Sequence, residues 1–121
     1  MLIALWIINA MLALVFLASG LTKVTRTSDR LAAAGMGWTE DRSPAAVKLV
    51  GAAETLGALG LVLPLATGVA TWLMPTAATA LVVLMGGAVA THVRRTEPFQ
   101  QPAVLGLVAA VSAVLGLLHL A

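Results

Sequence analysis

The chain has 121 residues, of which 60% are hydrophobic and only 10% are charged, and its formal net charge is +2. Soluble domains carry about 25% charged residues because their surfaces face water, so this composition excludes a water-soluble globule of this size. The chain has no cysteine, which also excludes a disulfide scaffold, a thiol redox pair and any cysteine-ligated metal centre. Its mean hydropathy of +1.02 is typical of an integral membrane protein.

Four apolar segments are long enough to cross a membrane as helices. A helix rises 1.5 Å per residue and the hydrocarbon layer is about 30 Å thick, so about 20 residues span it once. The segments are apolar on all sides, which argues against the alternating strands of a barrel. We therefore expect a single all-α domain over residues 1–121, a four-helix transmembrane bundle with up-down-up-down topology. The expected helices cover residues 2–21, 45–63, 68–93 and 103–121.

Two of these segments have a competing interpretation. The first resembles a cleaved signal peptide in position, but it lacks a basic start and its apolar run is too long for one. In the third, Pro75 either kinks a helix that begins near Gly68 or occupies the first turn of a shorter helix that begins near Thr76. In the shorter helix, Trp72 lies at the membrane interface. Residues 64–67 are expected to form the turn before this helix.

The basic residues predict the orientation of the chain. All seven lysine and arginine residues lie in or beside two connecting segments, residues 22–44 and 94–102. Because cytoplasmic loops carry the excess of lysine and arginine, we expect both charged loops in the cytoplasm and both termini outside. This role explains the basic residues better than nucleic-acid binding. Within the longer loop, Ser28 as N-cap and Gly35 as terminator predict a short helix, and Trp38 is expected at the lipid headgroups.

Glu54 is the strongest candidate for a functional residue. It follows Ala45 by nine residues, about 13.5 Å along a helix axis, and therefore lies near the middle of the bilayer. A bare carboxylate there costs at least a few kcal/mol, so Glu54 should face the bundle interior and be protonated or paired. Two roles stay open: a proton-handling or ligand-binding acid, and a neutral side chain that hydrogen-bonds a neighbouring helix.

Four further polar residues are candidates for the same site. Residue counting places Asn9 and Ser112 within about 7–8 Å of the level of Glu54, so both could donate hydrogen bonds to it. Asn9 and Lys23 share the inward face of the first helix, since the 14 residues between them are close to a whole number of turns. Lys23 is nevertheless expected to extend to the headgroups. His92, at the membrane boundary, is expected either to bind a loop carbonyl or to exchange protons.

The remaining polar residues do not suggest a resident cofactor. His92 and His119 are about 20 Å or more apart along the bundle axis, which excludes a bis-histidine haem within one chain. Glu54 and His92 are offset by about eight residues, a poor arrangement for a metal. We expect no metal and no covalently bound prosthetic group, so redox chemistry would use a quinone or another diffusible lipophilic molecule, or a partner's cofactor.

Small residues spaced four apart favour close packing of membrane helices. We expect them to pack the bundle, with self-association as the alternative. The pairs are Ala53 with Gly57, Gly86 with Ala90, and Gly106 with Ala110, continued by Gly60 and Gly116.

Three stretches resemble the DoxX-like family, the DoxX/DoxD group of small membrane proteins. FLASGLTK at residues 16–23 is similar to the end of that family's first helix, ETLGALGLVLP at 54–64 to its second-helix motif, and GAVATHVRR at 87–95 to its third-helix ending. The resemblance implies a four-helix inner-membrane protein in which Lys23, Glu54 and His92 coincide with the family's polar positions. Some relatives are associated with quinone-linked oxidation of sulfur compounds or with membrane oxidoreductase complexes, and no catalytic scheme transfers.

The expected function is support of a membrane redox system by binding a quinone-like or other lipophilic molecule near Glu54. His92 and Lys23 would connect this acid to the cytoplasm. The alternatives are a structural or assembly subunit without a ligand, and a small proton-coupled transporter that oligomerises. Besides the lipid bilayer, the expected partners are the lipophilic molecule and either a membrane oxidoreductase or further copies of the chain.

Overall fold

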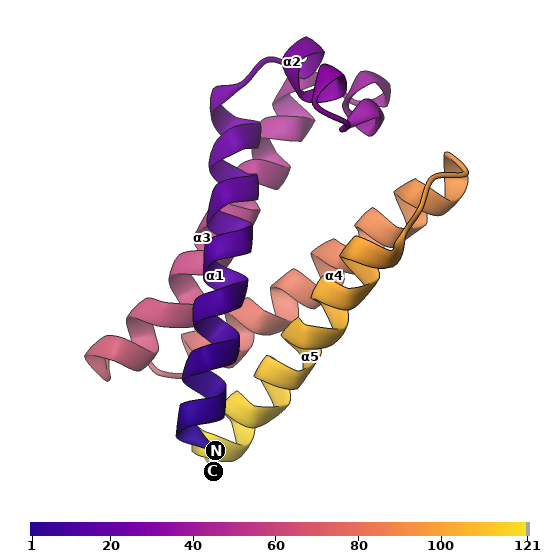
Figure 1. Ribbon diagram of the computed structural model, residues 1–121. Coiled ribbons are helices and arrows are strands. Elements are labelled where there is room, and N and C mark those ends of the chain that lie inside the picture. Colours follow the sequence, from indigo (N-terminus) through magenta and orange to yellow (C-terminus); the bar gives the residue numbers. More distant parts are fainter. Residues whose placement is uncertain (121) are drawn as a thin grey trace.

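The computed structural model describes residues 1–120, which contain helices and connecting segments but no strand. Four helices have the length and composition to cross a membrane, so the predicted all-α transmembrane bundle is confirmed. They are α1 (Leu2–Thr25), α3 (Pro44–Thr67), α4 (Leu73–Arg94) and α5 (Gln100–Leu120). A short helix α2 (Ser28–Ala33) and the 3-10 helix η1 (Gly37–Asp41) lie between α1 and α3 (Figure 1).

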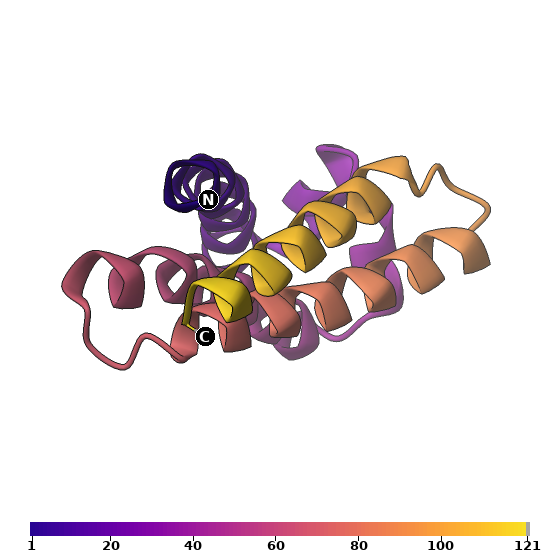
Figure 2. The same ribbon diagram turned by 90° about the horizontal axis from the view of Figure 1, so that it is seen from below.

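The long helices form two antiparallel pairs, α1 with α3 and α4 with α5. The start of α1 and the end of α5 lie at one end of the molecule, where the pairs come together, and the pairs diverge toward the end that carries α2 and η1 (Figure 1). We call these the terminal end and the loop end. Figure 2, seen from the terminal end, shows α1 nearly end-on while α4 and α5 run obliquely across the view. The pairs therefore cross rather than run parallel.

An apolar core joins the two helix pairs, and the outer surface of the bundle is also apolar. The core includes Leu5, Leu12, Phe16, Leu61, Met74, Ala78, Leu81 and Ala109. Many large apolar side chains on the outside are exposed, as a lipid-facing surface requires. Examples are Ile3, Leu14, Leu49, Leu56, Val83 and Leu107.

The turn between α3 and α4 lies elsewhere than the sequence predicts. Pro64 is buried inside α3, which continues to Thr67 and ends at Gly68 with left-handed backbone (φ 71°). The connection therefore spans residues 68–72, and the expected turn at residues 64–67 is wrong. A proline removes only one backbone donor, and packing against neighbouring helices lets a membrane helix continue through it.

The start of α4 decides between the two interpretations of Pro75. Helix α4 begins at Leu73, so Pro75 lies in the first turn, where a backbone N–H has no partner within the helix. The long kinked helix from Gly68 is wrong, and the shorter helix is close to the observed one. Trp72 directly precedes α4 and is exposed.

Residues 28–41, which we call the loop segment, fold as one unit at the loop end. Thr27 rather than Ser28 caps α2, with its side-chain oxygen accepting from the Arg30 backbone N–H at 3.3 Å. Gly35 follows α2 with a positive φ of 103°, the conformation expected of a terminating glycine. The fully buried Thr39 donates its hydroxyl proton toward Met36 O at 2.8 Å and Ser28 O at 3.2 Å, which ties η1 to α2.

Glycines set the spacing of the helices, as predicted for Gly57, Gly60, Gly106 and Gly116. A Cβ on Gly20 would lie 2.6 Å from Gly51 O, and a Cβ on Gly51 would lie 2.7 Å from Gly20 O, so α1 and α3 touch backbone to backbone. Gly57 and Gly60 of α3 face α4, and Gly106 and Gly116 of α5 also face α4. Gly86 differs, because nothing lies within 4 Å of a Cβ placed there.

Candidate functional site

Glu54 and Lys23 form an ion pair inside the protein. Lys23 Nζ on α1 bonds Glu54 Oε1 on α3, and it donates a second hydrogen bond to Ser19 Oγ at 2.7 Å. Lys23 is 7% exposed and Glu54 is 2% exposed. Glu54 thus faces the interior with a partner, as its position predicts. The expectation that Lys23 extends to the headgroups is wrong. Extending Lys23 to the headgroups would leave the buried Glu54 carboxylate unpaired, and an unpaired buried charge costs more free energy than a buried ion pair.

Trp38 of η1 lies close to this pair. Lys23 Nζ is 5.7 Å from the centroid of the indole ring, within the range of a cation–π interaction. Trp38 therefore contacts the interior of the protein, whereas the sequence analysis predicts that it lies at the lipid headgroups. The loop segment consequently contributes to the site as well as the long helices do.

A cavity of about 600 Å³ lies between the two helix pairs, in the half of the molecule near the loop end. This volume is in the usual range of about 300–1,000 Å³ for small-molecule sites. Glu54, Lys23 and His92 all line it. Its apolar wall includes Val15, Phe16, Leu84, Met85 and Leu105, and its further polar side chains include Ser19, Arg42, Thr91 and Gln101.

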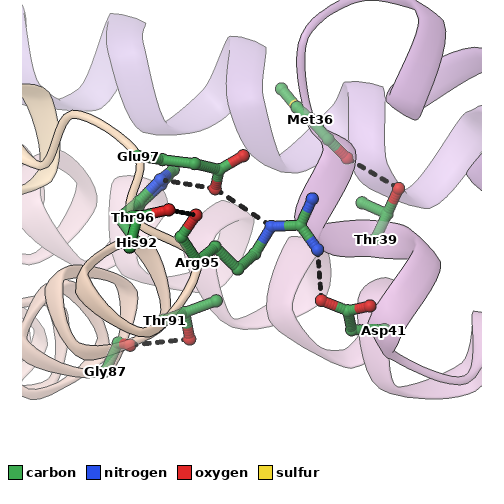
Figure 3. A network of polar contacts seen from close by, with 9 residues as sticks. All are labelled: Met36, Thr39, Asp41, Gly87, Thr91, His92, Arg95, Thr96 and Glu97. Atoms are coloured by element: carbon green, nitrogen blue, oxygen red, sulfur yellow. Dashed lines mark hydrogen bonds and ion pairs between the residues drawn. The ribbon is translucent and has the colours of Figure 1, made fainter.

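His92 lines the cavity and has a carboxylate beside it. His92 Nδ1 is 3.3 Å from Glu97 Oε1, although the contact lacks the alignment of a hydrogen bond (Figure 3). No bond from His92 Nδ1 to a loop carbonyl occurs within residues 1–120, contrary to one of the two expectations.

Arg95 connects this corner of the site to the loop segment. Its Nη1 bonds Asp41 Oδ2 of η1, and its Nε donates to Glu97 Oε1 at 3.1 Å (Figure 3). The hydrogen bond to Asp41 raises the pKa of Arg95, and the bond to Glu97 adds to this effect. Because a guanidinium is always protonated in proteins, Arg95 meets both carboxylates as a cation.

Asn9 and Ser112 form a separate polar contact. Asn9 Nδ2 donates to Leu61 O at 2.9 Å, and Ser112 Oγ donates to Asn9 Oδ1 at 2.5 Å. Leu61 follows Glu54 by seven residues of α3, about 10 Å toward the terminal end, so the expected hydrogen bonds to Glu54 are wrong. Neither residue lines the cavity. The depth count failed because α1 continues to Thr25, which shifts Asn9 away from the level of Glu54.

Three residues that contribute contacts at the site were not predicted from the sequence. Ser19 precedes Lys23 by four residues, one helical turn, and this spacing was a usable signal for their contact. Arg95 and Asp41 are 54 residues apart and carried no local signal.

The family assignment agrees with this architecture. The model of the DoxX-like family matches residues 7–117, nearly the whole chain. The chain belongs to the DoxX-like family. A search of curated proteins and a search of solved structures each gave no match. Every residue that lines the cavity of this DoxX-like protein falls within the matched range.

Proposed function

We propose that this DoxX-like protein binds a quinone-like lipophilic molecule in the cavity and thereby supports a membrane redox system. The observation that carries the proposal is a buried Lys23–Glu54 pair on the wall of a mainly apolar cavity inside a membrane protein. Ionisable residues within membrane helices are costly, so they usually mark a ligand or proton pathway.

The pair offers both a donor and an acceptor to a ligand. Lys23 carries three N–H donors and uses two of them on Glu54 and Ser19, which leaves one for a carbonyl oxygen. Glu54 engages Lys23 through Oε1, which leaves Oε2 to accept from a hydroxyl. A quinone interconverts between a dicarbonyl and a dihydroxy form, which carries two electrons and two protons. Lys23 and Glu54 can therefore orient either form and exchange protons with it.

The electrons in this proposal come from a membrane oxidoreductase that shares the quinone. His92 lines the same cavity, and in this proposal it is the group that exchanges protons between the pair and water. The apolar side chains of the wall, among them Phe16 and Leu105, would contact the lipophilic tail.

We also propose that the loop end faces the cytoplasm of an inner membrane, with both termini outside. All seven lysine and arginine residues lie at or near this end. The chain lacks cysteine, so a single cysteine placed at residue 40 or at residue 69 is the only thiol of the variant that a maleimide can label. Residue 69 should react with an impermeant maleimide outside and residue 40 only after lysis; the reverse pattern would contradict this orientation.

The binding test uses decylubiquinone and the purified protein in lipid nanodiscs. Glu54→Gln keeps the shape and one acceptor for Lys23 but loses the charge, and the loss of a charged hydrogen bond should weaken binding about tenfold or more. Glu40→Gln is the matched control, because Glu40 is exposed and lies outside the cavity. Equal affinity for wild type and Glu54→Gln, or no binding by either, would contradict the proposal.

Proton-coupled transport is a second candidate, favoured by the position of the cavity in only one half of the molecule. The cavity lies near the loop end, whereas Asn9, Ser112 and apolar residues close the bundle toward the terminal end. Transport requires that the terminal end also open. Proteoliposomes that bind decylubiquinone but move no protons across the membrane on adding it would favour binding alone.

A further inference from the structure

Two polar contacts hold the helix pairs together, one at each end. Near the terminal end, Ser112 of α5 donates to Asn9 of α1 in a fully buried contact. At the loop end, Arg95 after α4 bonds Asp41 of η1. No other side-chain hydrogen bond or ion pair joins α4 and α5 to the rest of residues 1–120.

These two contacts differ in their exposure to solvent. The side chains of Arg95 and Asp41 are 27% and 59% exposed, whereas Asn9 and Ser112 are completely buried. An exposed ion pair exchanges readily with water and contributes little free energy, so it can open without unfolding the bundle. The pair at the loop end is therefore the contact that can break while the terminal end stays closed.

The loop segment lies where this opening would expose the cavity. Met36 and Trp38 line the cavity, and Figure 1 shows the loop segment at the loop end, over the space between the diverging helix pairs. On the α1 side, Trp38 contacts Lys23. On the α4 side, the Arg95 guanidinium lies against Gly37, where an added Cβ would be 3.0 Å from Nη2.

We infer that residues 28–41 form a lid over the cavity and that Arg95 is the positioning residue that holds the lid closed through Asp41. The loop segment is suited to move as a unit, because the Thr39 hydroxyl ties η1 to α2. Breaking the contact with Arg95 removes the polar tie of the lid to α4 and leaves its contact with Lys23. This inference concerns access to the cavity and holds for any molecule that occupies it.

Trp38 reports directly on the position of the lid. With Trp6→Phe and Trp72→Phe as background, Trp38 is the sole tryptophan. Acrylamide quenching of its fluorescence is then measured without any ligand, so the result does not depend on the proposed quinone binding. Arg95→Ala and Asp41→Ala should each raise the quenching constant by up to about fivefold, since this is the largest shift of an open–closed equilibrium that the loss of an exposed ion pair produces.

Two controls separate the positioning role of Arg95 from a general effect of substitution on the fluorescence of Trp38. Arg94→Ala removes the adjacent arginine, which makes no ion pair within residues 1–120, and should leave quenching unchanged. Asp41→Glu keeps the carboxylate and should retain low quenching, while Asp41→Ala does not. Equal quenching in Arg95→Ala and Arg94→Ala, or high quenching in Asp41→Glu, would overturn the inference.

Discussion

Lys23 and Glu54 are 31 residues apart in the chain and form a buried ion pair that joins α1 to α3 beside a cavity. The pair is electrically neutral as a whole, which allows both charges to lie within the apolar interior. Each charge depends on the other, and this dependence makes their substitution informative about both stability and function.

The first prediction separates the stability of this pair from its role. Lys23→Met and Glu54→Leu should each destabilise the protein by about 3–5 kcal/mol, because each leaves one buried charge unpaired. The double variant should recover most of that loss, because no buried charge remains, yet it should not bind decylubiquinone. Thermal unfolding in detergent and the nanodisc binding assay give the two measurements. A double variant as unstable as the sum of the singles would show that the two residues do not act as a pair.

The second prediction concerns the polar contact near the terminal end. Ser112→Ala should destabilise the bundle by about 0.6 kcal/mol, up to about 1.7, the range measured for hydrogen bonds between membrane helices. Decylubiquinone binding should not change, because Asn9 and Ser112 lie outside the cavity. Weaker ligand binding at unchanged stability would instead place these residues in the functional site.

The third prediction tests the close approach of α1 and α3. Gly20→Ala puts a Cβ against Thr55 Oγ1 and 2.6 Å from Gly51 O, so the helices must separate, at a cost of about 1–3 kcal/mol. Gly86→Ala is the matched control, since its Cβ meets nothing within 4 Å and alanine favours a helix by about 1 kcal/mol. The two variants should therefore shift the unfolding temperature in opposite directions; equal shifts would contradict the packing described for Gly20.

The fourth prediction examines the internal rigidity of the lid. Thr39→Val removes a buried hydroxyl that contacts Met36 O and Ser28 O, and should loosen η1 from α2. Quenching of Trp38 in the single-tryptophan background should rise, whereas Thr39→Ser should preserve the low value. The bundle itself should unfold at an unchanged temperature, and a large fall in that temperature would mean that Thr39 supports more than the lid.

Much of this architecture follows from the sequence because a membrane imposes simple rules. Lengths of apolar segments set the number of spanning helices, and the cost of a bare carboxylate in lipid required Glu54 to face inward with a partner. Helical periodicity placed Asn9 and Lys23 on the buried face of α1, and both are buried there. These inferences depend only on the solvent and on local geometry.

The partner of Glu54 and the cavity depended on the tertiary structure. Residue counting assigned Asn9 and Ser112 to Glu54, but the axial positions of the helices bring Lys23 to it instead. The two helix pairs enclose the cavity between them, and the fold of residues 28–41 brings Trp38 to the cavity and Asp41 to Arg95. Hydropathy determines which residues avoid water, whereas helix offsets and crossing angles come from side-chain packing between distant segments, which no local pattern encodes.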